Sequence, residues 1–400
     1  MGKSVKALIT PEVLAWARAS LGYSLEAAAR QLKVDASQLT SWEKGGASPT
    51  VSQLRRIATK YRKPLAVFYL PEPPRGFTPP HDYRRVSIGL EFSDPLELTT
   101  QVHLAQQRRS VMLELSDELD EPVPRFEGRA HLRDKPEATG QRLRKIIGIS
   151  TSRQFAWESD HEAFSWWKGA IESTGVLVFQ FTGVPISEAR AFSISEFPFP
   201  AISLNTGDYY LPRIFSLLHE LAHLLLRKSG LCDISDAYDR MEAEESVEVF
   251  CNHVAAAALM PPDEFLAEFE NSKRREPGMP GDYYAPMLAR KFKVSREAAL
   301  RRLLAFGHVS RELYVERREQ YIKEYRRRSD KRKKKGGFLA PALGSLVRCG
   351  DAYVNLVLTG YQQRRIPLSR VSDYLDVRTH QIPKVGSLAT ARAVRQRGRP

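Results

Sequence analysis

The chain is poor in cysteine and has no long hydrophobic run. Only three of its 400 residues are cysteines, Cys232, Cys251 and Cys349, and they form no C-x-x-C pair. Thiols this few and this widely spaced indicate no disulfide framework, which fits a reducing compartment. No stretch of about 20 apolar residues occurs, and the first residues lead into no apolar segment. We therefore expect a soluble cytoplasmic protein without a signal peptide or a membrane span.

Acidic residues are also fewer than basic residues. The 61 Lys and Arg residues outnumber the 47 Asp and Glu residues, which leaves a formal net charge of +14. This balance indicates an anionic partner, with nucleic acid as the first choice and a membrane surface as the second. The apolar content of 42% is ordinary for a globular protein, and 400 residues are enough for two or three domains.

The most informative segment is His219-Glu220-Leu221-Ala222-His223, which lies inside an apolar run. A helix places residues i and i+4 on one face, so both imidazoles can bind one metal ion. Glu220 can then hold a water beside that ion, which is the H-E-x-x-H arrangement of zinc peptidases. Burial of such side chains among leucines is costly unless they coordinate something. Two histidines packed on a core helix are the alternative, but the sequence favours His219 and His223 as metal ligands and Glu220 as the catalytic base.

A catalytic zinc site needs a third protein ligand and one open position. A second helix, expected over residues 244–260, offers several acidic side chains. We predict Glu248 as the ligand because it flanks the apolar stripe of that helix, with Asn252 one turn later as a side chain that supports a ligand. Glu244 and Glu245 are alternatives, although acidic residues are also common at an exposed helix start. We expect Zn²⁺ rather than manganese or iron, because this donor set suits zinc.

Short helices joined by sharp turns are expected near the N-terminus. Ser24 is predicted to cap a helix over residues 25–32, and Asp35, in an Asp35-x-x-Gln38 capping box, begins the next helix at residues 36–44. This is the helix-turn-helix pattern, in which the second helix enters the major groove of DNA. Binding of a related protein is the alternative. The predicted DNA contacts are Ser37, Gln38, Thr40, Ser41 and Lys44.

Composition divides the rest of the chain. Residues 71–94 are rich in proline and predict an extended linker. Buried strands are expected over residues 174–182 and 201–205. The basic residues 311–337 predict a solvated helix that leads into a tether, with nonspecific DNA affinity or membrane contact as alternatives. Residues 338–400 are expected to form a last helical segment.

A short pattern occurs three times. It reads Leu32-Lys33-Val34-Asp35, then Phe292-Lys293-Val294-Ser295, then Leu375-Asp376-Val377-Arg378. Each copy has the character of a helix end, a turn and the start of another helix. Such turns are also a common way to pack small helices, so the sequence alone assigns them no function.

Two parts of the chain resemble known families. Residues 215–226, followed by residues 248–252 and 256–261, are similar to the ImmA/IrrE family of zinc metallopeptidases. The N-terminal part resembles XRE-type helix-turn-helix regulators, with Trp42-Glu43-Lys44-Gly45 after the second helix. Together the two resemblances cover roughly residues 8–310, in the order found in fused proteins of this kind.

The expected fold is α+β and mostly helical, with an all-α domain at residues 8–70 and a zincin-like domain with a small sheet at residues 95–310. The resemblance implies a gluzincin-like site, with His219, His223 and Glu248 as ligands and Glu220 as base. It also implies a bacterial or phage-related transcription regulator whose zinc endopeptidase cleaves a protein, namely a helix-turn-helix repressor.

Two alternatives to proteolysis stay open. The peptidase fold can serve a DNA-binding regulator as a sensor or interaction domain without cleavage. The chain can also act as an antitoxin-like partner of a toxin. Because helix-turn-helix proteins commonly bind two half-sites, a homodimer is expected.

Overall fold

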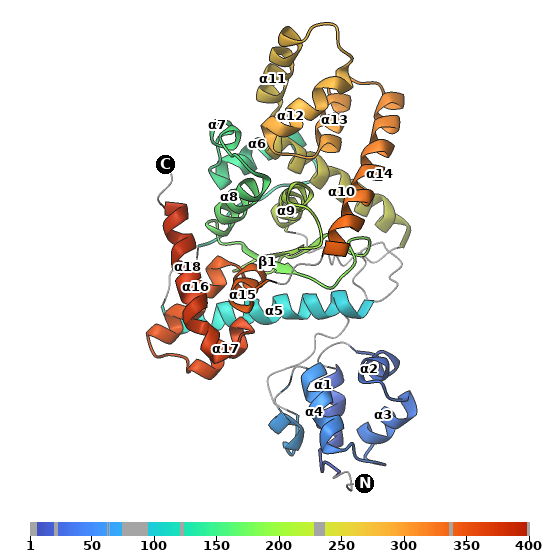
Figure 1. The fold of residues 1–400 in the computed structure, drawn as a ribbon, viewed down its shortest axis with the longest axis vertical. Helices are drawn as coiled ribbons and strands as arrows, with labels where there is room; N and C mark the ends of the chain where they lie inside the picture. The colour runs from blue at the N-terminus through green and yellow to red at the C-terminus, as the bar shows by residue number, and fades with distance from the viewer. Residues whose placement is uncertain are drawn as a thin grey trace. The chain divides into compact units, whose positions relative to one another are not determined.

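The computed structural model describes residues 6–19, 23–61, 63, 65–73, 95–120, 124–227, 237–335 and 339–397. The chain divides into two compact units, Met1–Leu104 and Ala105–Pro400 (Figure 1). As predicted, the described residues are mostly helical and include one small sheet. Among them, no helix combines the length and apolar character that a membrane crossing requires. Most of the predicted linker, residues 74–94, lies outside the described residues.

The first unit is built of short amphipathic helices. They are α1 (Pro11–Ala19), α2 (Leu25–Leu32), α3 (Ala36–Glu43), α4 (Val51–Lys60) and the 3-10 turn η1 (Leu65–Tyr69). Their apolar faces share one core that includes Leu32, Leu39 and Trp42. Trp42 is only 3% exposed. Its indole therefore stabilises the unit and is not available to read a base.

The caps of these helices confirm one prediction and correct another. Ser24 caps α2, and its hydroxyl accepts a hydrogen bond from the Ala27 N–H at 3.2 Å. Asp35 precedes α3, but its side chain makes no capping hydrogen bond, so the predicted capping box is wrong. The reciprocal arrangement lies instead at α4. There Thr50 Oγ1 accepts from the Gln53 N–H at 3.2 Å, and Gln53 Oε1 accepts from the Thr50 N–H at 2.8 Å.

A three-stranded sheet lies at the centre of the second unit. Its strands are β1 (Leu177–Phe181), β2 (Ala191–Ile194) and β3 (Ala201–Asn205), in the order β1-β3-β2. β3 is parallel to β1 and antiparallel to β2. β1 and β3 fall within the predicted ranges. β2 was not predicted, because four residues are too few to show an alternating pattern.

Helices pack on the sheet and on one another around one large core (Figure 1). α8 (Asp160–Glu172) packs on β1, and α9 (Tyr210–Leu225) packs on β2 and β3. α10 (Ala237–Leu259) packs against both α9 and α6 (Pro136–Ile147). α15 (Pro341–Cys349) contacts β1, and α16 (Asp351–Gln362) places Tyr353 edge-on to Phe179 at 6.1 Å between ring centroids.

The remaining described helices lie before, between and after these elements in the sequence. They are α5 (Pro95–Glu118), α7 (Thr151–Phe155), α11 (Pro262–Arg275), η3 (Gly281–Tyr284), α12 (Ala285–Phe292), α13 (Arg296–Ala305), α14 (Arg311–Lys335), α17 (Leu368–Leu375), η4 (Thr379–Gln381) and α18 (Ile382–Arg397). The basic run predicted as a helix and tether forms α14. This helix is anchored by side chains, since Arg317 pairs with Asp282 at 2.6 Å and Arg296 pairs with Glu324.

Candidate metal centre

Two adjacent helices carry the polar cluster of the second unit. The H-E-x-x-H segment lies on α9, whose buried face includes Leu217, Leu221 and Leu225. His219 and His223 lie one turn apart at the edge of that face. Their side chains are only 14% and 8% exposed. Because the leucines fix the rotation of α9 against the core, both imidazoles are held towards α10.

Glu248 of α10 meets these imidazoles. Its Oε2 lies 3.2 Å from His219 Nε2, and its Oε1 lies 3.1 Å from His223 Nε2. The two Nε2 atoms are 3.1 Å apart. One donor atom from each residue lies within 4.8 Å of the others, and among the described residues no other group of three or more His, Cys, Asp or Glu does so. The structure thus brings together the three residues predicted as ligands.

The cluster is electrostatically suited to a cation. The imidazoles of His219 and His223 hold the pKa of the Glu248 carboxyl well below its usual range. Burial opposes protonation of His219, but the hydrogen bond to Glu248 and the charge of Glu220 outweigh it and raise the His219 pKa. A positive charge is therefore favoured where the three side chains converge. Two imidazole nitrogens and one carboxylate are also donors that a divalent transition metal accepts.

Glu220 is held by the strand that the sequence did not predict. Ser193 of β2 donates a hydrogen bond from Oγ to Glu220 Oε2 at 2.7 Å. β2 packs against α9, so the hydroxyl reaches the carboxylate directly beside His219. Ser193 is a site residue missed from the sequence. Its only local signal was a polar residue within the short apolar segment Ala191–Ile194.

Asn252 lies one turn after Glu248 on α10 and is half-buried. Its side chain contributes to the raised pKa of His219. No hydrogen bond of ordinary geometry joins the two, because His219 Nδ1 is buried without a direct partner. Asn252 is thus near the cluster, as expected. The side chains of Glu244 and Glu245 lie outside the described residues.

Other polar residues near the motif lie elsewhere. Tyr209 and Tyr210 begin α9, roughly 14 Å along the helix axis from His219. His253 is exposed on α10 and does not belong to the cluster. Cys251 is fully buried in the apolar core, where burial raises the pKa of its thiol. The thiol therefore packs and takes no part in the cluster.

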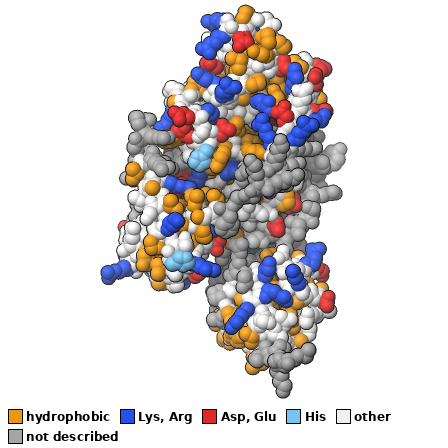
Figure 2. Space-filling model, in the orientation of Figure 1, with side chains coloured by type: hydrophobic (Ala, Val, Ile, Leu, Met, Phe, Trp, Pro, Cys, Tyr) orange, Lys and Arg blue, Asp and Glu red, His pale blue; other side chains and the backbone are white. Residues whose placement is uncertain are grey.

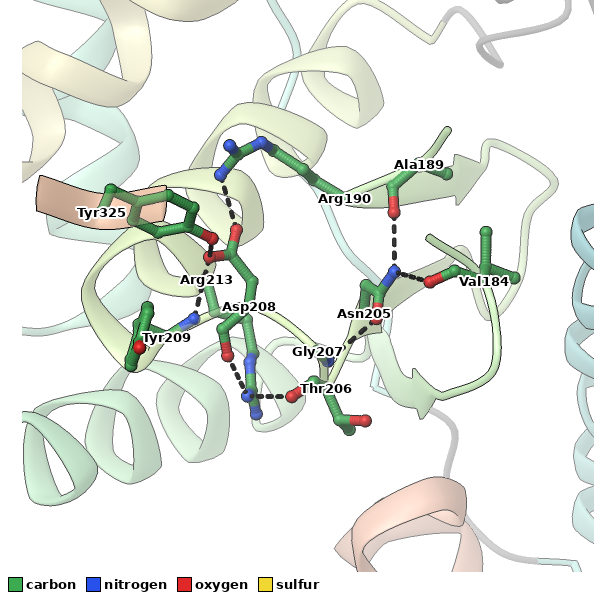
Figure 3. Close-up of polar contacts among 10 residues, drawn as sticks. All are labelled: Val184, Ala189, Arg190, Asn205, Thr206, Gly207, Asp208, Tyr209, Arg213 and Tyr325. Atoms are coloured by element: carbon green, nitrogen blue, oxygen red, sulfur yellow. Dashed lines mark hydrogen bonds and ion pairs between the residues drawn. The ribbon is translucent and has the colours of Figure 1, made fainter. Parts of the chain in front are cut away.

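A polar network fixes the turn that leads into the motif helix (Figure 3). Asp208, only 1% exposed, accepts from Arg190 Nη1 at 2.6 Å and from the Tyr325 hydroxyl at 2.6 Å. Arg213 of α9 donates to the Asp208 carbonyl at 2.8 Å and to Gln180 Oε1 of β1 at 2.8 Å. Sheet, helix α9 and helix α14 are thereby joined at one point, which sets where α9 begins.

Asn205 completes this turn. Its side-chain amide donates to the carbonyls of Val184 and Ala189, each at 2.8 Å, and its Oδ1 accepts from the Gly207 N–H at 2.9 Å (Figure 3). Sequence reasoning missed this network. The turn composition Asn205-Thr206-Gly207-Asp208 after a strand was its only local signal.

The predicted DNA contacts lie on α3 or directly after it. Ser37, Gln38 and Lys44 are exposed, and Ser41 is half-buried. The Thr40 hydroxyl donates to the Ala36 carbonyl at 2.8 Å and is therefore engaged by its own helix. Ser37, Gln38 and Lys44 are the most accessible of the five to a ligand.

Comparison with known families agrees with this description. Residues 14–68 match the helix-turn-helix family, and residues 172–304 match the IrrE N-terminal-like domain, a peptidase family. No curated protein matches the chain. The chain therefore joins an XRE-type helix-turn-helix domain, which supports DNA binding, to an ImmA/IrrE-type peptidase domain. The matched peptidase region includes β1 to β3, α9 and α10, so every residue of the cluster falls within it.

Proposed function

We propose that the protein is a DNA-associated transcription regulator whose second unit is a zinc-dependent endopeptidase acting on another protein. The observation that carries this proposal is the meeting of His219, His223 and Glu248, with Glu220 held beside them by Ser193. A structural role alone does not require two imidazoles and a carboxylate to converge next to a second, separately held carboxylate.

In this proposal His219, His223 and Glu248 would hold Zn²⁺, because two imidazoles and one carboxylate match the donors of a catalytic zinc site. When bound, zinc supplies Lewis-acid polarisation of the scissile carbonyl and eases deprotonation of water. Glu220 takes the proton from the attacking water at its carboxylate and delivers it to the leaving amine. Ser193 keeps that carboxylate oriented through its 2.7 Å hydrogen bond.

The substrate would lie along β2. The central strand β3 (Ala201–Asn205) pairs on both sides and has no free edge. Within the described part of the chain, β2 pairs only with β3 and carries the Glu220 partner Ser193. An extended segment of a protein substrate can add to such an edge by main-chain hydrogen bonds. A helix-turn-helix repressor is the proposed substrate.

Glu220→Gln tests the proposal. The amide keeps the shape of the side chain but accepts no proton, so metal content and DNA affinity should equal those of the wild type while cleavage is lost. New N-termini would be labelled and sequenced after incubation of each zinc-loaded protein with a bacterial proteome. Equal cleavage by both proteins would contradict the assigned base. A metal-loaded wild type that generates no new termini would favour a regulator that senses without cutting.

A further inference from the structure

The sequence pattern that occurs three times forms the same turn each time. In each copy a helix of eight residues, α2, α12 or α17, ends at a residue with left-handed backbone. These residues have closely similar φ and ψ angles: Lys33 (53°, 51°), Lys293 (50°, 53°) and Asp376 (50°, 49°). Left-handed residues also follow helices elsewhere in the chain, for example Arg227 and Arg364, so this turn is a common helix C-cap and the copies must be compared further by sequence and burial.

The chain leaves each turn in the same way. The valine after the left-handed residue donates its N–H to the carbonyl five residues earlier, in the pairs Val34–Ala29, Val294–Ala289 and Val377–Ser372. The next residue is extended in every copy and starts the second helix: Asp35 (−73°, 146°), Ser295 (−69°, 151°) and Arg378 (−67°, 147°). After Arg378 the 3-10 turn η4 leads directly into α18, which makes one helical segment, Thr379–Arg397.

The three copies also bury equivalent positions. Buried side chains lie one residue before the left-handed position, at Leu32, Phe292 and Leu375, and six residues after it, at Leu39, Ala299 and Ile382. The first copy is α2–α3, the pair within the helix-turn-helix match. The third copy, α17–η4–α18, has the same turn and the same spacing of buried residues, so it resembles the α2–α3 helix pair.

The second copy is closed to a ligand, and the third is open. In the second copy, Glu297 lies four residues after the left-handed position and accepts from the Tyr314 hydroxyl of α14 at 2.7 Å. α14 packs along α13 and covers that face. In the third copy the corresponding residue is His380, which is exposed.

Polar side chains occupy equivalent positions at the start of the second helix in the first and third copies; His380 and Lys384 are exposed, and Gln381 is half-buried. Counted from the left-handed residue, Ser37 and Gln38 correspond to His380 and Gln381, and Ser41 corresponds to Lys384. Glutamine can pair with an adenine edge, and lysine can bind a guanine edge or a phosphate. Glutamine therefore occupies the same position in both second helices, and the third copy adds the basic side chain of Lys384.

The net charge of residues 339–397 also favours DNA as the ligand. Residues 339–397 contain nine Lys and Arg but only three Asp and no Glu. Of these acids, Asp351 is paired with Lys168 and Arg392, and Asp376 is paired with Arg348. Exposed basic side chains remain around α17 and the start of α18, at Arg364, Arg365, Arg370, Arg378 and Lys384. A surface of this composition attracts a phosphate backbone.

We infer that α17–η4–α18 is a second DNA-binding element, with the start of Thr379–Arg397 facing a groove of duplex DNA and Arg378 and Lys384 at its phosphates or base edges. This goes beyond the proposed function, because it adds a nucleic-acid site to the second unit, outside both family matches. The chain would then contact DNA with both of its units.

The test measures binding of a fluorescent random-sequence duplex to the full-length protein by anisotropy over a range of salt concentrations. Arg378→Ala with Lys384→Ala should weaken binding and lower the slope of log affinity against log salt by about 2, since each lost phosphate contact removes roughly one counterion. The matched control is Arg274→Ala with Arg275→Ala, two exposed charges on α11, which should leave the slope unchanged.

Two further variants separate the binding sites and guard against misfolding. Gln38→Ala with Lys44→Ala should weaken DNA binding by the first unit while salt-dependent DNA binding by the second unit remains. Adding Arg378→Ala and Lys384→Ala to this variant should then remove the remaining binding. The charge-conserving pair Arg378→Lys with Lys384→Arg should keep the wild-type slope. The inference is overturned if the alanine pair behaves like the α11 control, or if the Gln38 and Lys44 changes alone abolish all binding. Neither result depends on peptidase activity.

Discussion

Ser193 and Glu220 lie 27 positions apart in the chain, yet a 2.7 Å hydrogen bond joins the Ser193 hydroxyl to the Glu220 carboxylate. The bond connects an edge strand of the sheet to the helix that carries both histidines. It restrains the proposed base through a side chain that lies outside the H-E-x-x-H segment. The orientation of Glu220 is thus a property of the packed sheet as well as of helix α9.

Replacement of Ser193 by alanine should slow cleavage without release of the metal. A hydrogen bond to a charged group contributes about 1.5–3 kcal/mol, so we expect kcat/KM to fall by at least about tenfold. Ser195→Ala is the matched control, because the Ser195 hydroxyl is buried without a partner among the described residues. Steady-state cleavage and metal content of both variants check this. An equal fall in kcat/KM in the two variants would contradict a positioning role for Ser193.

The contact between α6 and α10 should affect zinc affinity, because it sets the position of the helix that carries Glu248. A Cβ added at Gly140 of α6 would lie 2.5 Å from Ala257 Cβ and 2.8 Å from the Val254 carbonyl oxygen, both on α10. Gly140→Ala must therefore displace the helix that carries Glu248, at a cost of about 1–3 kcal/mol. We expect a lower melting temperature and weaker zinc binding, measured by calorimetric titration.

Gly386→Ala provides the control for this steric argument. Gly386 also lies within a helix, but a Cβ there meets nothing within 4 Å. Alanine should therefore leave metal affinity unchanged and stabilise α18 by roughly 0.5–1 kcal/mol. Wild-type zinc affinity in Gly140→Ala would show that α10 tolerates the displacement.

A buried ionic cluster should give stability a pH dependence. Lys168 Nζ lies 2.6 Å from Glu172 and 3.2 Å from Asp351. Burial raises the pKa of Glu172 to about 7, against an ordinary value of 4.5. The folded chain thus keeps a proton that the unfolded chain releases, and wild-type stability should fall as pH rises from about 4.5 to 7.

Glu172→Gln removes this titration. Relative to the variant, the wild type should lose up to about 3 kcal/mol of unfolding free energy across that window. Urea unfolding at several pH values, followed by tryptophan fluorescence, provides the comparison. Parallel pH profiles for the two proteins would rule out Glu172 as the titrating group.

The sequence predicted those parts of the site that depend on local geometry. His219 and His223 follow from i, i+4 spacing, and Glu248 follows from its place beside an apolar stripe. The hydrogen bond from Ser193 could not be predicted, because it depends on a four-residue strand whose position is set by pairing with β3. The Tyr325–Asp208 contact spans 117 positions and has no local signal.

The fold shows the same division. β1 and β3 were predicted because short, mostly apolar segments rich in Val, Ile and Phe are typical of buried strands. The capping box at Asp35 was wrong because the pattern permits the hydrogen bond without requiring it, and Thr50 with Gln53 makes it instead. The threefold pattern that includes Lys33, Lys293 and Asp376 was visible in the sequence. Only the structure showed that its turns share dihedral angles and that the last copy is exposed.

Metal content tests the central claim most directly. Wild-type protein, His219→Ala, Glu248→Ala, Glu244→Ala and His253→Ala would be purified, loaded with zinc, dialysed and analysed by inductively coupled plasma mass spectrometry. His253 is the matched control, since it lies exposed on the same helix as Glu248 but outside the cluster. We expect one zinc ion per chain in the wild type, Glu244→Ala and His253→Ala, and loss of the ion in the other two. Zinc retained by Glu248→Ala, or lost from Glu244→Ala alone, would contradict the assignment.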